Sequence, residues 1–292
     1  MKAEKVAAVG DIVITRVREY EHAREPEVFF EDATEVRRAL DEEPWLSEWC
    51  TAGGRLRLAF QAFVLEAPGT LMLVDPCIGN DRQRFFLPQP LQTSFLEDLA
   101  DSVGGLERID VVAFTHLHFD HIGWSTHRVH DRWAPTFPWA RHVIPGDEWE
   151  HWRVAVERDP ETDFTRAVDE SIHPLFVDEL VQLVDSDHEL ADGIRLRSTA
   201  GHSPGHVSID IESNGERAVI TGDVLHHPVQ VHEPGWQMRA DLDLVRGVSA
   251  RSDLVDEVVD SGALMIGTHF AGCCAGHVEA DDRGRRRFRA IA

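Results

Sequence analysis

The stretch IDVVAFTHLHFDHIGW, residues 109–124, places a short apolar run directly before three histidines and an aspartate. The run Ile109–Phe114 is rich in β-branched residues, which predicts a buried strand. An extended backbone beyond that strand would point alternate side chains to the same side, and Gly123 would then allow the chain to turn. Imidazole nitrogens and a carboxylate oxygen form a ligand set that suits Zn²⁺. We therefore expect a metal site after the strand, formed by His116, His118, Asp120 and His121.

Three more polar residues follow predicted strands further along the chain. In open α/β architectures, functional groups gather in the loops beyond the carboxyl ends of strands. The residues are His202 in AGHSPGHVS, after Ile194–Arg197 and before Val207–Ile211, Asp223 in ITGDV, after Ala218–Ile220, and His269 in MIGTHF, after Leu264–Ile266. Each one alone is commonly just a polar residue at a strand end, but the recurrence of the arrangement indicates one shared site.

The ordered set HLHFDH, GHSPGH, TGD and GTH resembles the motifs of the metallo-β-lactamase-fold hydrolases, and the match runs from about Leu56 to His269. The resemblance implies an α/β fold, an αββα sandwich of two mixed β-sheets flanked by helices, in a single domain over residues 1–292. It also implies two divalent metal ions in a cleft at one edge of the sandwich. The ligands that it implies are His116, His118 and His202 for the first ion, Asp120, His121 and His269 for the second, and Asp223 between the two.

The same resemblance assigns a chemistry to the site. The two ions, most simply Zn²⁺ although the ligand set also permits Mn²⁺, Fe²⁺ or Co²⁺, would share a hydroxide that attacks the substrate. Asp120 would be the catalytic residue that relays a proton to the leaving group. Asp75 would orient a ligand histidine through its other nitrogen, and His206 would lie beside the site without binding metal. Because the expected hydroxide is the attacking group, no side-chain nucleophile is needed and water is the expected nucleophile.

Within this superfamily the sequence most resembles the lactonase and organophosphate-hydrolase branch, which includes the acyl-homoserine lactonases. Those lactonases use a tyrosine near the metals, whereas this chain has a single tyrosine, Tyr20, far from every motif. We expect His226 or His227 to replace it, the alternative being that both are ordinary loop histidines. The expected reaction is hydrolysis of a lactone or related carboxylic ester. Phosphotriester or thioester hydrolysis is the alternative among enzymes, and a non-catalytic small-molecule sensor is the alternative outside them.

Aromatic residues near the motifs predict an apolar substrate pocket. The expected pocket residues are Phe85, Phe86, Phe119, Trp124, Phe137 and Trp236, together with His226 and His227. An uncharged, partly apolar ester or lactone would suit such walls better than a phosphorylated metabolite. Because most aromatic side chains belong to protein cores, the alternative is that some of these residues are buried away from the substrate.

The composition restricts the partners of the chain. A formal net charge of −23 would repel the phosphate backbone of a nucleic acid, and the basic stretch 283–289 is expected to be a solvated terminal strand. No apolar run approaches the ~18 residues that span a bilayer, and the first residues do not form a secretion signal. The four cysteines form no CxxC pattern, which favours a reducing cytoplasm. Relatives in the branch are often dimers, which favours a homodimer.

Sequence patterns also predict the elements around the motifs. Strands are expected at Val6–Val17, Leu56–Leu65 and Leu71–Val74, and helices from Ser94 to about Ser102 with a Ser94–Glu97 capping box, at Glu148–Glu157, and at Ala240–Val259 with a stop at Gly262. The acidic stretch 19–49 carries prolines and aromatic residues among its charges. We expect it to form a lid or surface excursion over the main body, and a helix packed on the edge of the domain is the alternative.

Overall fold

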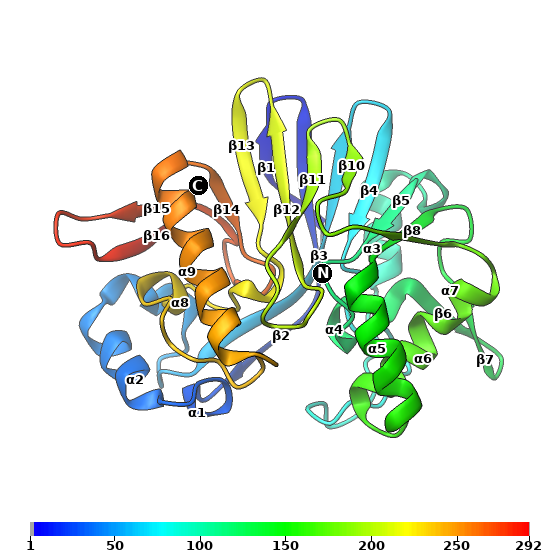
Figure 1. Cartoon of the computed structure of the whole chain (residues 1–292), viewed down its shortest axis with the longest axis horizontal. Coiled ribbons are helices and arrows are strands. Elements are labelled where there is room, and N and C mark those ends of the chain that lie inside the picture. The colour runs from blue at the N-terminus through cyan, green and yellow to red at the C-terminus, as the bar shows by residue number, and fades with distance from the viewer. Residues whose placement is uncertain (1–2, 292) are drawn as a thin grey trace.

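Two seven-stranded β-sheets lie face to face at the centre of the molecule in the computed structural model, which describes residues 3–291 (Figure 1). The first sheet has the strand order β1 (Ala3–Val9), β2 (Ile12–Arg24), β3 (Leu56–Ala67), β4 (Thr70–Val74), β5 (Val111–Ala113), β8 (Arg141–Pro145), β9 (Val181–Val184). The second has the order β10 (Glu189–Ala191), β11 (Ile194–Ser198), β12 (Val207–Ser213), β13 (Glu216–Ile220), β14 (Leu264–Ile266), β15 (Ala275–Ala280), β16 (Arg286–Ala290). Both sheets contain parallel and antiparallel pairs, so both are mixed.

Helices cover the outer faces of the two sheets (Figure 1). They are α1 (Pro26–Phe29), α2 (Ala33–Glu42), α3 (Phe95–Val103), α4 (Phe119–Ile122), α5 (Gly146–Arg158), α6 (Asp163–Ser171), α7 (His173–Val177), α8 (Val229–His232) and α9 (Leu244–Ser261). Short 3-10 turns lie at Pro44–Trp49 (η1), Leu106–Arg108 (η2), Gly123–Ser125 (η3) and Gly222–Val224 (η4), and a separate hairpin is formed by β6 (Thr126–Val129) and β7 (Arg132–Pro135). The described residues therefore form the expected αββα sandwich, and no helix in the range 3–291 is long and apolar enough to cross a membrane.

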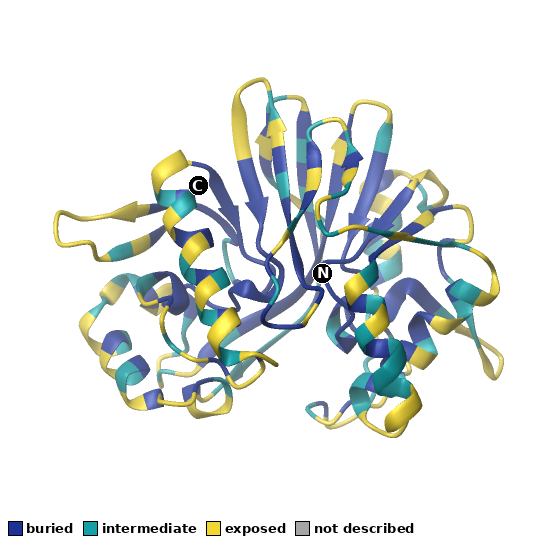
Figure 2. Ribbon diagram, in the orientation of Figure 1, coloured by how far each residue is buried: buried dark blue, intermediate teal, exposed yellow. Residues whose placement is uncertain are grey.

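Alternation along the strands builds the core in two layers. On β3, Phe63 and Leu65 face the second sheet and join the same apolar cluster as Ile209 of β12. Val64, between them in sequence, faces the opposite way and packs with Phe95 of α3. Successive side chains of a strand point to opposite faces, so a strand buried on both faces reads as one continuous apolar run. Figure 2 shows the burial that results, with the buried residues concentrated in the strands.

The amino-terminal segment differs from the single strand expected at Val6–Val17. The structure forms a hairpin, because Gly10 has φ +53° and the chain reverses there between β1 and β2. A Cβ atom at position 10 would lie 2.5 Å from the backbone oxygen of Ser213, so glycine is also required by close packing. Strand β2 then continues to Arg24, so the start of the stretch 19–49 belongs to the first sheet. The rest of that stretch forms α1, α2 and η1, whose Phe30, Val36 and Leu46 pack against β3.

The predicted helix signals are partly confirmed. Helix α9 begins at Leu244, four residues later than expected, where the Asp243 carboxylate accepts hydrogen bonds from two backbone amides, and it ends at Gly262 as expected. Helix α3 follows Ser94, but the expected capping box does not form, because the Ser94 hydroxyl is hydrogen-bonded to Asp98. The basic terminal stretch contains strand β16 at the edge of the second sheet, where Arg289 is paired with Glu279.

Candidate metal centre and its cavity

The HLHFDH loop leaves the carboxyl end of β5 and turns directly into helix α4. His118 is the last extended residue, and Asp120 and His121 already belong to the helix. The alternation expected to continue to Asp120 is therefore wrong, because the loop changes from extended to helical backbone after His118. Gly123 does not make the turn either: its φ is −60°, and a Cβ atom there would lie 1.7 Å from the backbone oxygen of Ile78. The glycine is needed because two loops touch at this point.

The seven residues singled out in the sequence meet at one edge of the sandwich. They form two clusters that share one residue: the first cluster is His116, His118, His202 and Asp223, and the second cluster is Asp120, His121, Asp223 and His269. Within each cluster, one nitrogen or oxygen atom from every residue lies within 4.8 Å of the others. Most of these side chains are buried, and Asp120, with 12% of its side chain exposed, is the most accessible.

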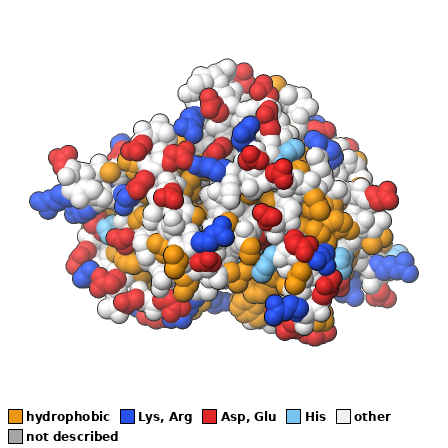
Figure 3. Space-filling model, viewed as in Figure 1, with side chains coloured by type: hydrophobic (Ala, Val, Ile, Leu, Met, Phe, Trp, Pro, Cys, Tyr) orange, Lys and Arg blue, Asp and Glu red, His pale blue; other side chains and the backbone are white. Residues whose placement is uncertain are grey.

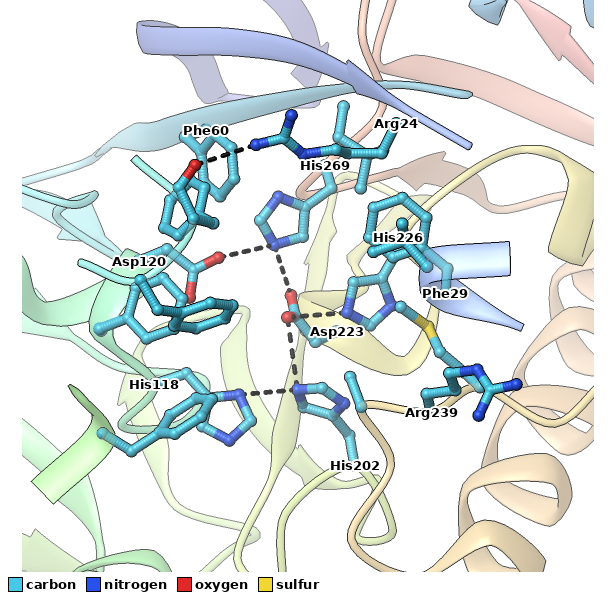
Figure 4. Close-up of a pocket in the computed structure, with 18 of the residues that line it drawn as sticks. Arg24, Phe29, Phe60, His118, Asp120, His202, Asp223, His226, Arg239 and His269 are labelled. Atoms are coloured by element: carbon cyan, nitrogen blue, oxygen red, sulfur yellow. Dashed lines mark hydrogen bonds and ion pairs between the residues drawn. The ribbon is translucent and has the colours of Figure 1, made fainter. Parts of the chain in front are cut away.

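The Asp223 carboxylate lies between the two clusters. Its Oδ2 atom is 3.4 Å from Nε2 of His202 in the first cluster, and its Oδ1 atom is 3.1 Å from Nε2 of His269 in the second. Figure 4 shows the carboxylate in the middle of the cavity floor with the histidines around it. Within the clusters, Nδ1 of His118 and Nε2 of His202 are 2.9 Å apart, and Nε2 of His121 and Nε2 of His269 are 3.2 Å apart.

The ring nitrogens that point away from the clusters are hydrogen-bonded. Nδ1 of His121 is 3.0 Å from the Asp75 carboxylate, the position that the family resemblance implied for this aspartate. Nδ1 of His202 is 3.1 Å from the Asp241 carboxylate, and Nδ1 of His269 is 2.8 Å from the backbone oxygen of Ala59. Such partners fix the orientation and tautomer of an imidazole, leaving its other nitrogen free to bind a metal.

The electrostatic environment favours cation binding. Burial lowers the pKa of His116, His118 and His202 well below the usual value, so their rings are neutral at pH 7 and their nitrogen lone pairs are available. Burial acts in the same direction on the second cluster but is outweighed there. The carboxylates, first of all Asp223, raise the pKa of His121 well above its usual range and also raise that of His269. The second cluster therefore concentrates negative charge that calls for a positive partner.

The atoms that face the space between the residues fit a divalent cation. Nε2 of His116 is buried and has no hydrogen-bond partner among residues 3–291. Buried polar atoms without partners are rare, and they are explained when a bound ion supplies the missing contact. The histidine nitrogens and carboxylate oxygens are the ligand types of zinc and related first-row metals. The two clusters are therefore suited to binding divalent metal.

Two further polar residues join the motif loops to one another. His206 does not point into the clusters: its Nε2 accepts a hydrogen bond from the Asp223 backbone at 2.8 Å. The buried Glu148 accepts hydrogen bonds from Leu117 in the HLHFDH loop, at 3.0 Å, and from Ser203 in the GHSPGH loop, at 2.7 Å. The sequence analysis gave Glu148 no role in the site, because it lies in the first turn of a segment that reads only as an amphipathic helix.

Above the clusters lies a cavity of about 330 Å³. One wall is aromatic and comes from Phe85, Phe86, Phe119, Trp152 and Phe164; the rest of the lining comes from His22, Arg24, Val28, Phe29, Leu58, Phe60, Met238, Arg239, Ala240 and Leu242. Three of these, Val28, Phe85 and Leu242, are large apolar side chains that are more than half exposed. In Figure 3, hydrophobic side chains gather near the lower centre of the view, and acidic and basic side chains are interspersed over the rest of this face.

Several residues expected in the pocket lie elsewhere. Trp124 is buried against Phe95, with its indole nitrogen donating to Glu19 at 2.6 Å, and Phe137 belongs to the core between the first sheet and its helices. His227 is buried and hydrogen-bonded to the backbone oxygen of Trp49, at 2.9 Å. Trp236 packs against Phe30 behind the cavity. These four side chains do not line the cavity, because each fills a core or loop position behind the walls, whereas Phe85, Phe86, Phe119 and His226 line it.

His226 lies directly at the floor. Its Nε2 is 3.0 Å from Oδ2 of Asp223, and its ring is parallel to that of His269, with centroids 5.4 Å apart. Its Nδ1 atom is buried and has no hydrogen-bond partner among the described residues. Tyr20 does not line the cavity and stacks on Phe60 instead. Of the two histidines considered as a replacement for the lactonase tyrosine, His226 is the one beside the clusters.

Comparison with known proteins gives one family match. The model of a family described as the metallo-beta-lactamase superfamily matches residues 61–248, which include most of the motifs but not His269. The matched range thus contains both HLHFDH and the GHSPGH loop, together with Asp223.

Solved structures share the whole fold at low sequence identity. Hydrolase AbOPH of the beta-lactamase superfamily aligns with a TM-score of 0.83 and 23% identity over 100% of this chain and 98% of its own. AidC, a dizinc quorum-quenching lactonase solved with the product N-hexnoyl-L-homoserine, aligns with a TM-score of 0.79 and 18% identity over 100% of this chain and 98% of its own. A probable metal-dependent hydrolase from Staphylococcus aureus aligns with a TM-score of 0.78 and 20% identity over 98% of this chain and 100% of its own.

Proposed function

Because the chain belongs to the metallo-beta-lactamase superfamily, we propose that it is a metal-dependent hydrolase that cleaves a lactone or a related carboxylic ester. The observation that carries the proposal is the position of Asp223, whose two carboxylate oxygens face two separate histidine clusters. A carboxylate in that position can contact two cations at once. If only the first cluster bound an ion, Asp120, His121 and His269 of the second cluster would have no metal to bind.

The residues that would hold the two ions are those of the two clusters. His116, His118 and His202 would bind the first, Asp120, His121 and His269 the second, and Asp223 both. When bound, such ions lower the pKa of water toward ~7 and polarise a substrate carbonyl, with Zn²⁺ the first candidate and Mn²⁺, Fe²⁺ or Co²⁺ the alternatives. No side-chain nucleophile is required for this reaction.

Two residues of the chain would act on the substrate directly. Asp120 lines the cavity and is the most accessible carboxylate of the clusters, so we assign it the transfer of a proton to the leaving group. His226 also lines the cavity, and its Nε2 lies 3.0 Å from Oδ2 of Asp223, directly beside the clusters. We assign His226 the contact to the substrate carbonyl oxygen that a tyrosine makes in related lactonases.

The cavity walls favour an acyl substrate with apolar parts. Phe85, Phe86 and Phe119 offer aromatic surface beside the clusters, which suits an acyl or alkoxy chain better than a phosphorylated metabolite. The product N-hexnoyl-L-homoserine in the structure of the lactonase AidC supports the same class of substrate by analogy of fold alone. A phosphotriester or a thioester would use the same residues, and the substrate panel below separates these alternatives from the ester.

The proposal is tested by metal analysis and a substrate panel. Protein purified without added metal should contain close to two divalent ions per chain and should release acid from lactones or aryl esters faster than it cleaves phosphotriesters or thioesters. His118→Ala should lose most of the hydrolysis, and His173→Ala, which removes an exposed histidine paired with Asp169, should keep it. Fewer than one ion per chain, or full activity of His118→Ala, would contradict the dinuclear mechanism.

A further inference from the structure

Strand β2 brings two polar side chains to the cavity that the proposed reaction does not use. His22 and Arg24 are two residues apart on the last part of the strand, opposite Leu58 and Leu56 of β3. Alternate residues of a strand share a face, and both side chains line the cavity. Both contact Phe86, at one end of the aromatic wall, on the side of the cavity where Figure 4 shows Phe60 and His269 beside Arg24.

Arg24 has no acidic partner within the described chain. Its guanidinium donates one hydrogen bond, from Nη2 to the backbone oxygen of Phe86 at 2.9 Å, and no carboxylate of residues 3–291 lies within ion-pair distance of it. Arg239, the other arginine of the cavity, is different. Its guanidinium is paired with Glu31 at 3.0 Å and donates to the backbone oxygen of Phe30 at 3.1 Å, and Figure 4 shows it directed away from Asp223. The cavity thus has one arginine that is neutralised and one that is not.

His22 adds a second unpartnered group beside Arg24. Its Nδ1 atom is buried without a hydrogen-bond partner among the described residues. The ring is held edge-on between two aromatic rings, with centroid distances of 5.2 Å to Phe60 and 5.6 Å to Phe86. Burial, together with the positive charge of Arg24, lowers its pKa to about 4, so the ring is neutral at pH 7 and offers one N–H donor.

A cation beside apolar walls is stabilised best by a ligand that supplies an anion. A guanidinium presents its donors in a planar fork that matches the two oxygens of a carboxylate, and charge-assisted hydrogen bonds are stronger than neutral ones. An exclusively apolar substrate would cover Arg24 and leave its remaining donors without water or a partner. The local charge here is thus opposite in sign to the net charge of −23 of the whole chain.

We propose that His22 and Arg24 form a carboxylate-binding edge of the cavity, which selects esters or lactones that carry a carboxylate a few bonds away from the scissile carbonyl. The proposal rests on the proposed hydrolase function and names its substrate class more narrowly. The substrate would lie in the cavity, with its reacting carbonyl over the clusters, its carboxylate at Arg24 and its apolar part against Phe85 and Phe119.

The test uses aryl esters with acyl chains of equal length that end in a methyl, a carboxamide or a carboxylate group. The wild-type protein, loaded with metal, should hydrolyse the carboxylate ester with a KM about tenfold below that of the methyl ester, the effect of one charge-assisted hydrogen bond. Arg24→Met should abolish that preference and leave kcat for the methyl ester near its wild-type value. Arg24→Gln, which keeps donors but not the charge, should bind the carboxamide and carboxylate esters equally, and His22→Phe should reduce the preference in part.

Arg239→Met is the matched control, because Arg239 also lines the cavity but is neutralised by Glu31. It should shift KM for the three esters by the same factor. If Arg24→Met instead weakens all three esters equally, Arg24 only holds the Phe86 loop and the proposal is overturned. Equal KM values for the carboxamide and carboxylate esters in the wild type would overturn the assigned charge. If none of the three esters is hydrolysed, the proposed function itself fails. If all three are hydrolysed with the same KM, the proposed function stands and only the carboxylate-binding edge is overturned.

Discussion

The floor of the cavity, which is formed by the two histidine and aspartate clusters, and the aromatic wall are held in place in different ways. On the floor, His121, His202 and His269 are each fixed by a hydrogen bond on the nitrogen that faces away from the cavity. On the wall, Phe85 is 73% exposed, and its side chain is held by ring contacts with its neighbours, among them Phe86 at a centroid distance of 5.7 Å, while its backbone amide donates to the Asp163 carboxylate. The floor has directional bonds that fix angles and distances, whereas the phenylalanine rings of the wall have contacts that slide at little cost.

This difference indicates which property each region controls. Catalytic groups must be held close to one geometry, so floor mutations are expected to change metal binding and kcat. Apolar walls contribute binding area that is similar in the ground and transition states, so wall mutations are expected to change KM. The predictions below test this division, beginning with the residue whose loss should matter most.

Asp223→Ala should have the largest effect. The variant removes the only carboxylate shared by the two clusters, and it leaves His202 and His269 without their common partner. A bound metal supplies several kcal/mol of transition-state stabilisation, so we expect kcat/KM to fall by about 10³-fold or more and the metal content to fall below two ions per chain. Kinetics and metal analysis on the same preparation measure both. Full metal content with only a tenfold loss of activity would contradict the assignment of metal binding and kcat to the floor.

His142→Phe tests whether burial alone distinguishes the floor histidines. His142 on β8 is fully buried like them, but neither of its ring nitrogens has a hydrogen-bond partner within residues 3–291, and it is not in either cluster. Burial lowers its pKa from 6.5 to about 4. The unfolded chain therefore takes up this proton first, and the stability that neutral His142 permits is present above pH 6.5 and lost as the pH falls toward 4.

We expect His142→Phe to bind metal and hydrolyse substrate at pH 7 like the wild type, and to be more resistant to acid. The gain in unfolding free energy near pH 4, relative to its value at pH 7, should be about 3 kcal/mol, as read from denaturant unfolding at several pH values. His277→Phe, at an exposed position on β15, is the control and should leave the pH dependence unchanged. If His142→Phe loses metal, a buried histidine without hydrogen-bond partners also supports metal binding, and the hydrogen bonds of the cluster histidines are not what distinguishes them.

Asp241→Asn should have a smaller effect, because it acts through His202. Its Oδ1 lies 3.1 Å from Nδ1 of His202, and its Oδ2 accepts from the buried guanidinium of Arg251 at 2.7 Å. Residues that orient a metal-binding histidine typically contribute 10–100-fold to metal affinity or activity, and we expect a loss in that range, measured by metal titration and by kcat. Asp210→Asn, which removes a carboxylate paired with Arg197 far from the clusters, is the control and should change neither quantity.

The residues of the two clusters could be singled out from the sequence because each of them follows a strand in a short motif. His116, His202, Asp223 and His269 each stand just beyond the carboxyl end of a predicted strand, and strand order brings those ends to one edge. Asp241 was missed because the sequence pattern placed it inside the expected helix Ala240–Val259, whereas it lies in the loop between α8 and α9. Its contact with His202 spans 39 positions in the chain, and only the packing of Arg251 on α9 brings the two together.

The wall was predicted less well because an aromatic residue alone does not reveal its direction. Phe119 lies within the HLHFDH motif and Trp124 lies three residues after it. Nevertheless, Trp124 points into the core and Phe119 points into the cavity. The direction of Trp124 is decided by the buried Glu19 carboxylate, which comes from β2 and accepts its indole N–H. Arg24 was missed for a related reason: the acidic stretch 19–49 hid the fact that β2 continues to that residue.

Phe85→Ala should have the smallest effect and the most selective one. The ring is exposed and touches only the aromatic neighbours of the wall, with Phe119 at a centroid distance of 5.8 Å, so its removal should change the unfolding free energy by less than about 0.5 kcal/mol. KM for an aryl ester with a long apolar chain should rise roughly three- to tenfold, the loss of one aromatic contact of about 1 kcal/mol, at constant kcat and constant metal content. Val177→Ala, which trims an equally exposed apolar side chain away from the cavity, should leave KM unchanged. If kcat for Phe85→Ala falls instead, the wall also positions the reacting carbonyl, and the division between floor and wall does not hold at this residue.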